Sequence, residues 1–297
     1  MRYFLLCLAL LLLLPVGDSH AFSFGIGQGK DNRGTNLNIG SLFKAGKAVS
    51  MTFKDISPMQ EYYIGRTLSA VIINEHKPYD NQQANDYLNL LGQTLAQASD
   101  MPETFGGYHF LILDSDSINA FAAPGGLIFV TRGLIRCCAS EDALAAVLAH
   151  EISHVQLKHG LQAIKKARIT TALTVMAMET NMNQGGLVES AVYSNTLGDA
   201  VTDVTVTLVN NGYSKSFEYA ADQAALTIMG RIGYNPSAML DMLGIMKSRL
   251  QPGGSDFSKT HPSPDARISR ISSKIDETEL SQSPAKEKRY QQFLNSI

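Results

Sequence analysis

The sequence lacks any block of basic residues. Its 297 residues include 25 Lys and Arg against 27 Asp and Glu, which gives a formal net charge of −2 at pH 7. Because nucleic acids and anionic membrane surfaces are recognised by clustered positive charge, the composition favours neither as a partner. The sequence also lacks internal repeats with a period of about 20 to 50 residues, which excludes a solenoid array.

Long apolar runs are scarce as well. One such run, at residues 3–14, follows Arg2 and is shorter than the roughly 20 residues that span a bilayer, which disfavours a membrane anchor. Small residues at Ser19 and Ala21 match the positions that a signal peptidase reads. The pattern predicts a cleaved signal peptide at residues 1–21 and an exported chain without a transmembrane helix, located in the periplasm if the host has two membranes.

Cysteine is nearly absent. Of the three cysteines, Cys7 lies in the apolar run, and Cys137 and Cys138 are adjacent. A disulfide between neighbouring cysteines is strained, and a helical setting would point their side chains apart. Their spacing also matches no zinc motif. We therefore expect both thiols to be buried as small apolar side chains.

The chain is organised around an H-E-x-x-H motif that begins at His150 and ends at His154. The surrounding Ala and Leu residues predict a helix, on which the two histidines lie one turn apart on one face. Both imidazoles can therefore reach one metal ion. Glu151 is rotated by about 100° from His150, which suits a general base for a water whose pKa zinc lowers to about 7. The alternative is a core helix that carries two histidines by coincidence.

An acidic pair later in the chain, Glu218 and Asp222, could complete this site. The two residues are four apart and share a helix face, so Glu218 can bind the metal while Asp222 accepts a ring N–H from a ligand histidine. Two imidazoles and one carboxylate leave a fourth position for water, which predicts one catalytic Zn²⁺ per chain. The alternative is a solvated acidic pair on a surface helix. His159 is not expected to be a ligand, because a continuous helix would rotate it about 140° from His154.

The remaining patterns predict a mainly helical α+β fold with a small sheet that packs against the helix of the histidine motif. Segment 181–211 has no clear periodicity, and 251–258 reads as a polar loop. Short apolar runs between turn signals predict strands at 108–113, 118–122 and 127–131. Helical spacing and capping signals predict helices at 57–75, 81–98, 140–160, 161–178, 217–229, 235–250 and 264–276.

Four motifs together resemble a known family. The H-E-x-x-H motif, followed by Glu218 and Asp222, resembles the gluzincin pattern. The stretches Asn-Ala-Phe-Ala-Ala-Pro-Gly-Gly at 119–126 and Thr-His-Pro-Ser-Pro-Asp-Ala-Arg at 260–267 narrow the resemblance. From about residue 58 to residue 275, the sequence is similar to the zinc metallopeptidases that include the CaaX prenyl proteases, HtpX and the periplasmic BepA and LoiP proteins.

The resemblance implies a zinc-dependent endopeptidase. Its gluzincin-type metallopeptidase domain would occupy 51–280, after an N-terminal arm at 22–50 and before a charged C-terminal tail at 281–297. Its substrates would be unfolded or misassembled envelope polypeptides, with outer-membrane proteins among the candidates. We expect neither prenyl-protein substrates nor a repeat-mediated docking partner, because the spanning helices and helical-repeat extension of some members have no counterpart here.

The resemblance also assigns a substrate-binding edge. In the family, the Asn-Ala-Phe-Ala strand is the edge along which an extended substrate pairs, and this edge strand would line the cleft. In this sequence the strand consists of Asn119, Ala120, Phe121 and Ala122.

His261 has three possible roles. His261 lies between Thr260 and Pro262, in a stretch whose two prolines favour an extended loop, and the resemblance places this loop near the cleft. His261 could donate a hydrogen bond to the developing oxyanion, or it could act as a fourth zinc ligand that displaces water and keeps the enzyme latent. It could also be an exposed loop histidine. Arg267 could support the loop or share the oxyanion role.

Two functions from other classes compete with proteolysis. One is a zinc-binding chaperone or scaffold with little proteolysis, which the intact Glu151 disfavours. The other is a helical binding module without metal, in which the motif is coincidental. Glu218, Asp222 and the Asn-Ala-Phe edge disfavour that second alternative.

Overall fold

The computed structural model describes residues 56–166, 212–249, 261–275 and 283–297. None of the helices in these segments has the length and apolar character needed to cross a bilayer. Residues 159–166 are helical, and the rest of the helix expected at 161–178 lies outside the described residues. The same is true of the expected signal peptide at 1–21, the arm at 22–50, the irregular segment at 181–211 and the loop at 251–258.

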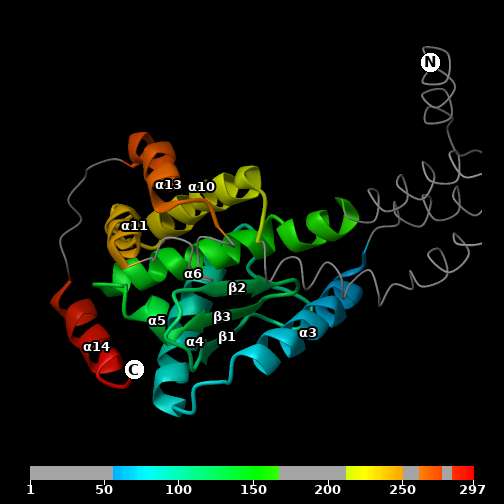
Figure 1. Cartoon of the computed structure of the whole chain (residues 1–297), viewed down its shortest axis with the longest axis horizontal. Coiled ribbons are helices and arrows are strands. Elements are labelled where there is room, and N and C mark those ends of the chain that lie inside the picture. Colours follow the sequence, from blue (N-terminus) through cyan, green and yellow to red (C-terminus); the bar gives the residue numbers. More distant parts are fainter. Residues whose placement is uncertain (1–55, 167–211, 250–260, 276–282) are drawn as a thin grey trace, which may run out of the picture. The chain divides into compact units, whose positions relative to one another are not determined.

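The described residues form a mainly helical α+β fold with one small sheet, as predicted (Figure 1). Each predicted helix or strand that lies within them is present. The short helix α5 and the last helix, α14, were not predicted. In chain order the elements are α3 (Pro58–Glu75), α4 (Gln82–Gln97), β1 (His109–Leu113), β2 (Ala120–Ala123), β3 (Leu127–Thr131), α5 (Arg132–Ile135), α6 (Glu141–Gln156), α10 (Lys215–Arg231), α11 (Ala238–Arg249), α13 (Pro264–Ile271), the 3-10 turn η1 (Ser272–Lys274) and α14 (Pro284–Leu294).

Serine side chains set the starts of the main helices. Ser57 begins α3 with a capping box, in which its hydroxyl accepts from the Gln60 N–H while the Gln60 side chain accepts from the Ser57 N–H. Ser140 caps α6 and Ser214 caps α10, each by accepting a backbone N–H three residues on. These caps satisfy N–H groups that a helix start leaves unpaired, and they fix where the two site helices begin.

The sheet has the strand order β1-β3-β2, with β1 parallel and β2 antiparallel to β3. Strands β2 and β3 are joined by a tight turn at Pro124, where Gly125 and Gly126 adopt φ values of 80° and 96° that favour glycine. Among the described strands β2 pairs only with β3, so it is an edge of the sheet, as predicted.

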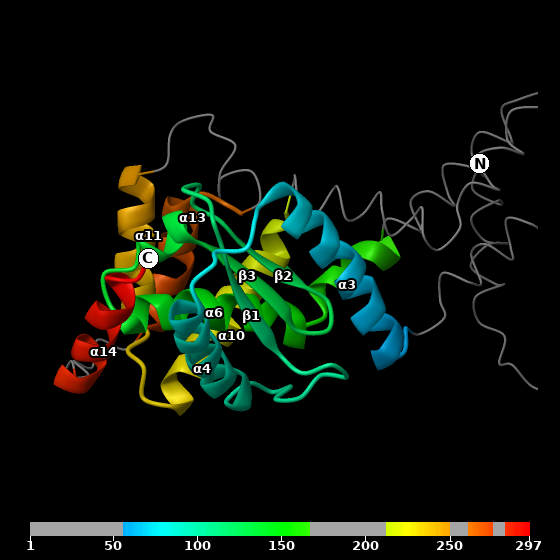
Figure 2. The same ribbon diagram turned by 90° about the horizontal axis from the view of Figure 1, so that it is seen from below.

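The two faces of the sheet pack against different helices, and α6 and α3 lie on opposite sides of it (Figures 1 and 2). Ala120 and Ala122 belong to the larger core, which includes α4 and α6. Phe121 and Ala123 face the other way and pack with Leu68 and Ile72 of α3. This alternation follows from the two-residue period of a strand. The side chains of Ala120 and Ala122 therefore face α6, the helix of the histidine motif.

Helix α6 runs through the core, and all its residues from Ala143 to Val155 are buried. It contacts α4, α10, α11, α14 and β2. Alanine dominates its first half, and small side chains let neighbouring helices approach closely. The motif residues His150, Glu151 and His154 are therefore held in the interior, where a polar group without a partner is costly.

The helix of the histidine motif ends at Gln156, before the expected boundary at residue 160. Lys158 then adopts the left-handed conformation, with φ of 54°, and helical structure resumes at residue 159. Glycine or asparagine commonly occupies such a position. Because the sequence has Lys there and its Gly at position 160, the break was not predicted.

The charged segment at 281–297 was expected to be a tail, but its described part forms helix α14. Tyr290 and Phe293 are buried against the core, and the Tyr290 hydroxyl donates to the Cys138 carbonyl at 2.7 Å. Two aromatic residues three positions apart give the helix an apolar stripe that its charged composition obscures. Cys137 and Cys138 are both free and buried, as predicted.

Candidate metal centre

Four buried side chains converge between α6, α10 and the loop that precedes α13. They are His150 and His154 from α6, Glu218 from the first turn of α10, and His261. One nitrogen or oxygen atom from each lies within 4.8 Å of the others. The structure thus brings together the three residues predicted as ligands and adds His261 to them.

The distances within this cluster fit a metal ion. Nε2 of His150 and Nε2 of His154 face each other at 3.1 Å, and the Glu218 carboxylate oxygens lie 3.3 and 3.4 Å from these nitrogens. Nδ1 of His261 lies 2.6 Å from Oε2 of Glu218. Oε1 of Glu218 is buried and has no hydrogen-bond partner within the described part of the chain. A buried oxygen without a hydrogen-bond partner lowers the stability of the fold unless a cation binds it. Imidazole nitrogens together with a carboxylate are ligands typical of zinc sites.

Asp222 orients His150, one of the predicted ligands. Its Oδ1 lies 2.9 Å from Nδ1 of His150, so Nε2 of that ring points into the cluster. Arg267 holds the Asp222 carboxylate in turn, through Nε at 3.0 Å and Nη2 at 2.5 Å. Nη2 of Arg267 also lies 3.2 Å from Nδ1 of His150, so Arg267 contacts both the Asp222 carboxylate and this imidazole.

His159 orients His154, the other predicted ligand histidine, through a contact that the sequence did not predict. Its Nδ1 lies 2.9 Å from Nδ1 of His154, and its ring stacks on Phe217 with centroids 4.4 Å apart. The left-handed turn at Lys158 redirects the chain and returns His159 to His154. His159 is outside the group of converging atoms.

The protonation states of His154, Glu218 and Asp222 suit metal binding. Burial lowers the pKa of His154 to about 3, so its imidazole is neutral. Burial raises the pKa of Glu218, but nearby His261 and His154 outweigh it and hold that pKa well below its ordinary value. For Asp222 burial is likewise outweighed, here by Arg267 and His150, and its pKa is also low. Neutral imidazoles and ionised carboxylates are the forms that bind a metal ion.

Glu151 lies beside the cluster without belonging to it. It is buried on α6, and its carboxylate is not among the converging ligand atoms. Burial raises its pKa, against the opposing effects of His150 and His261. A carboxylate with a raised pKa is a better proton acceptor, as a general base requires.

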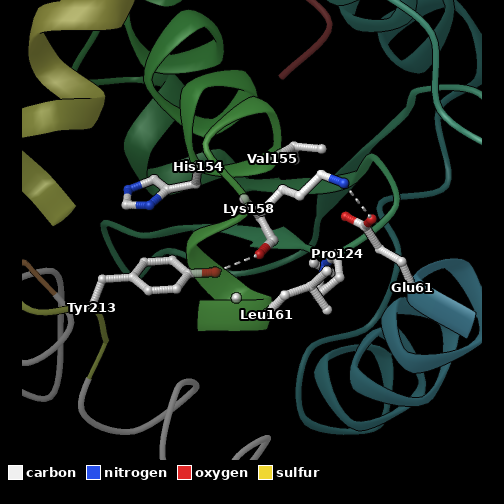
Figure 3. A pocket seen from close by; sticks show the side chains of 10 residues that line it. Glu61, Pro124, His154, Val155, Lys158, Leu161 and Tyr213 are labelled. Carbon is white, nitrogen blue, oxygen red and sulfur yellow. Dashed lines mark hydrogen bonds and ion pairs between the residues drawn. The ribbon is translucent and has the colours of Figure 1, made fainter. Parts of the chain in front are cut away.

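A pocket adjoins the cluster at the end of the edge strand (Figure 3). It brings Ala122 of β2 next to the metal-site residue His154, so one predicted substrate-binding residue borders the site. Phe121 points to the opposite face of the sheet, and the side-chain oxygen of Asn119 accepts from the Ala120 N–H at 3.0 Å. The lining also includes Glu61, Pro124, Lys158 and Tyr213.

His261 is a buried residue of the cluster. Only 8% of it is exposed, and it contacts Glu218, which contradicts the alternative of an exposed loop histidine. Arg267 is fully buried against Asp222 at the start of α13, an arrangement that anchors the loop carrying His261.

The residues of this site lie within a part of the sequence that matches a known protein family. The profile of peptidase family M48 matches residues 82–275, which include all four converging residues together with Asp222 and Arg267. The chain belongs to peptidase family M48. The family resemblance predicted from the sequence motifs is thereby confirmed.

Relatives in this family include named proteases. The chain is 30% identical over 216 residues to the beta-barrel assembly-enhancing protease of Escherichia coli (strain K12), covering 71% of this chain and 42% of the relative. It is 29% identical over 164 residues to the mitochondrial metalloendopeptidase OMA1 of Schizosaccharomyces pombe, covering 54% and 45%. It is 26% identical over 216 residues to a protease HtpX homolog of Acaryochloris marina, covering 62% and 71%. The chain spans less than half the length of the first two relatives.

Proposed function

We propose that this protein is a zinc-dependent endopeptidase. The observation that carries the proposal is the buried cluster of His150, His154, Glu218 and His261, in which Oε1 of Glu218 has no hydrogen-bond partner among the described residues. One Zn²⁺ per chain fits this donor set. When bound, zinc polarises a peptide carbonyl and lowers the pKa of a water molecule to about 7.

Different residues of the protein have different roles in hydrolysis. His150, His154 and Glu218 hold the ion, while Asp222 keeps the first imidazole in its binding orientation. Glu151 accepts the proton of the attacking water on its carboxylate and then transfers that proton to the leaving nitrogen. Its raised pKa favours the first transfer, the uptake of the water proton.

His261 acts in this proposal as a fourth ligand that holds the enzyme latent. Its nitrogen lies with the other three ligand atoms, and four protein ligands close a zinc site to water. Activity then requires His261 to withdraw. The same arrangement is what favours the second candidate function, a zinc-binding chaperone or scaffold with little proteolysis.

For substrates and location we propose export followed by action on envelope polypeptides that are unfolded or misassembled. The apolar run after Arg2 supports a signal peptide at 1–21 and a periplasmic site of action. The names of the Escherichia coli and Yersinia pestis relatives, beta-barrel assembly-enhancing proteases, support outer-membrane proteins as substrates. The peptidase domain would occupy 51–280 after an arm at 22–50.

The test combines metal analysis with cleavage of unfolded casein. Wild type should contain one zinc per chain and cleave casein at the low rate that withdrawal of His261 allows, and a chelator should abolish this cleavage. Glu151→Gln should retain zinc and the fold while losing cleavage, because an amide cannot take up the proton. The matched control Glu75→Gln, at an exposed position of α3, should behave as wild type. Zinc without chelator-sensitive cleavage would favour the scaffold, and absence of zinc would reject both functions.

A further inference from the structure

Tyr213 precedes the capping serine of α10 and makes two contacts at the site, one with its ring and one with its hydroxyl (Figure 3). The ring stacks on the imidazole of His154, with centroids 4.2 Å apart and 16° between the ring planes. The hydroxyl donates to the carbonyl oxygen of Ala122 at 3.1 Å. This side chain therefore links the helix that carries the metal ligands to the edge strand.

The carbonyl that Tyr213 holds faces away from the sheet. In an antiparallel pair, alternate residues direct their backbone groups toward the partner strand and away from it. The Thr131 N–H donates to the Asn119 carbonyl at 3.0 Å, so Asn119 faces β3. Phe121, two residues on and opposite Phe129, also faces β3. Ala122 lies between such positions, and its N–H and C=O point to the free edge, where an added strand would pair.

We propose that Tyr213 controls access to the edge strand by occupying the Ala122 carbonyl that a bound polypeptide needs for backbone pairing. This inference rests on the proposed function, because it requires an extended substrate to pair with β2. A carbonyl oxygen can accept two hydrogen bonds. The tyrosine side chain nevertheless stands on the outward side of Ala122, where the added backbone would have to lie.

The surroundings of Tyr213 keep its hydroxyl in place as a donor. Burial raises the pKa of the phenol, and the charges of Glu151 and Glu218 raise it further, so the hydroxyl remains protonated. Gly160 provides the space beside it: a Cβ at that position would come 3.4 Å from the Tyr213 hydroxyl and 2.9 Å from Cγ of Pro124. The ring, its stacking partner and the glycine together hold the hydroxyl against the edge strand.

Binding of a polypeptide must therefore break one hydrogen bond between the hydroxyl and the strand. The net free-energy contribution of one such hydrogen bond corresponds to about a two- to tenfold change in a binding constant. Tyr213→Phe removes the hydroxyl and retains the stacked ring, so the Ala122 carbonyl becomes available while the contact with His154 remains. We expect this variant to bind unfolded polypeptide about two- to tenfold more tightly.

The experiment measures binding of fluorescently labelled unfolded casein by anisotropy in the Glu151→Gln background, with and without Tyr213→Phe and at equal zinc content. In the active background, Tyr213→Phe should lower KM and leave kcat unchanged. The matched control is Tyr79→Phe, which removes a hydroxyl that donates to the Ser296 carbonyl at 2.7 Å. Its affinity for casein should equal that of the parent. Melting temperatures confirm that each variant is folded.

Unchanged or weaker casein binding by Tyr213→Phe, beside normal cleavage in the active background, would overturn the role of Tyr213 alone. Weaker binding would mean that the hydroxyl contributes to the bound complex. If no variant binds or cleaves casein although zinc is retained, both this inference and the endopeptidase function are wrong. Tighter binding by Tyr213→Phe but not by Tyr79→Phe supports the inference.

Discussion

Oδ1 of Asp222 lies 2.9 Å from Nδ1 of His150, and this contact fixes the direction in which the imidazole presents its other nitrogen. Asp222 is itself held by two hydrogen bonds from Arg267. A chain of three side chains thus runs from α13 through α10 to α6 and ends at the metal cluster. Such supporting contacts preorganise metal ligands without touching the ion.

The first prediction distinguishes the role of Glu218, the proposed ligand, from that of Asp222, which orients a ligand. Glu218→Ala should abolish tight zinc binding, because it removes a proposed ligand. Asp222→Ala should weaken zinc binding by about 10- to 100-fold, the usual effect of losing a group that orients a ligand. Zinc content after dialysis against chelators of graded strength distinguishes the two. Asp241→Ala, at an exposed position of α11, is the control. If Glu218→Ala keeps a full complement of zinc, another residue is the ligand.

Much of this site follows from helical periodicity alone. His150 and His154, and likewise Glu218 and Asp222, are each four residues apart, so their shared faces could be read from the sequence. The strands and the turn before β3 were also marked by short apolar runs and glycines. These features follow from local rules, which depend on residues close together in the sequence.

The parts that were missed depend on contacts distant in the sequence or on an unmarked backbone conformation. His159 reaches His154 only because Lys158 adopts a left-handed conformation, which no glycine announces. Tyr213 meets Ala122 across 91 positions of the chain. Helix α14 was missed because its apolar stripe is narrow and its composition is charged.

His261→Ala is expected to raise kcat. Removing the fourth ligand leaves three protein ligands and an open position, which is the arrangement of catalytic zinc sites. The check is steady-state cleavage of casein at full zinc occupancy. His109→Ala, an exposed histidine whose Nε2 contacts the Gly106 carbonyl, should leave kcat unchanged. A lower kcat for His261→Ala with zinc retained would instead identify His261 as an oxyanion donor.

Ala122→Pro should impair substrate binding and spare the metal. The lost N–H points to the free edge, so the hydrogen bonds between β2 and β3 are retained. KM for long substrates should rise while zinc content stays constant. Ala122→Gly, which keeps the N–H, is the matched control. An unaltered KM in a folded Ala122→Pro protein would argue against strand addition at this edge.

The carboxylate of Glu141 makes a contribution to the free energy of unfolding that depends on pH. Its buried carboxylate accepts from the hydroxyls of Tyr87 and Tyr234 and pairs with Arg289 of α14. Burial raises its pKa, but these partners outweigh burial and leave the pKa below the ordinary 4.5. The pKa of Glu141 is therefore lower in the folded than in the unfolded protein. Its contribution to stability is complete at pH values above its pKa in the unfolded protein, and it is lost as the pH falls through its pKa in the folded protein.

Glu141→Gln should therefore lower the free energy of unfolding at pH 7 by about 1.5–3 kcal/mol, a typical value for hydrogen bonds to a charged group. Urea unfolding at several pH values should show the difference from wild type shrinking once the pH falls below about 4.5. Glu287→Gln, on an exposed part of α14, provides the comparison. A difference that does not vary with pH would show that packing, and not the charge, accounts for the effect.

X-ray absorption at the zinc edge of the purified full chain tests the proposed metal centre most directly. The account predicts one zinc per chain, bound by nitrogen and oxygen at about 2.0–2.2 Å and without sulfur. Three histidine nitrogens should contribute in wild type and two in His261→Ala. Sulfur ligands, a histidine signal that His261→Ala leaves unchanged, or absence of zinc would contradict the four-residue site.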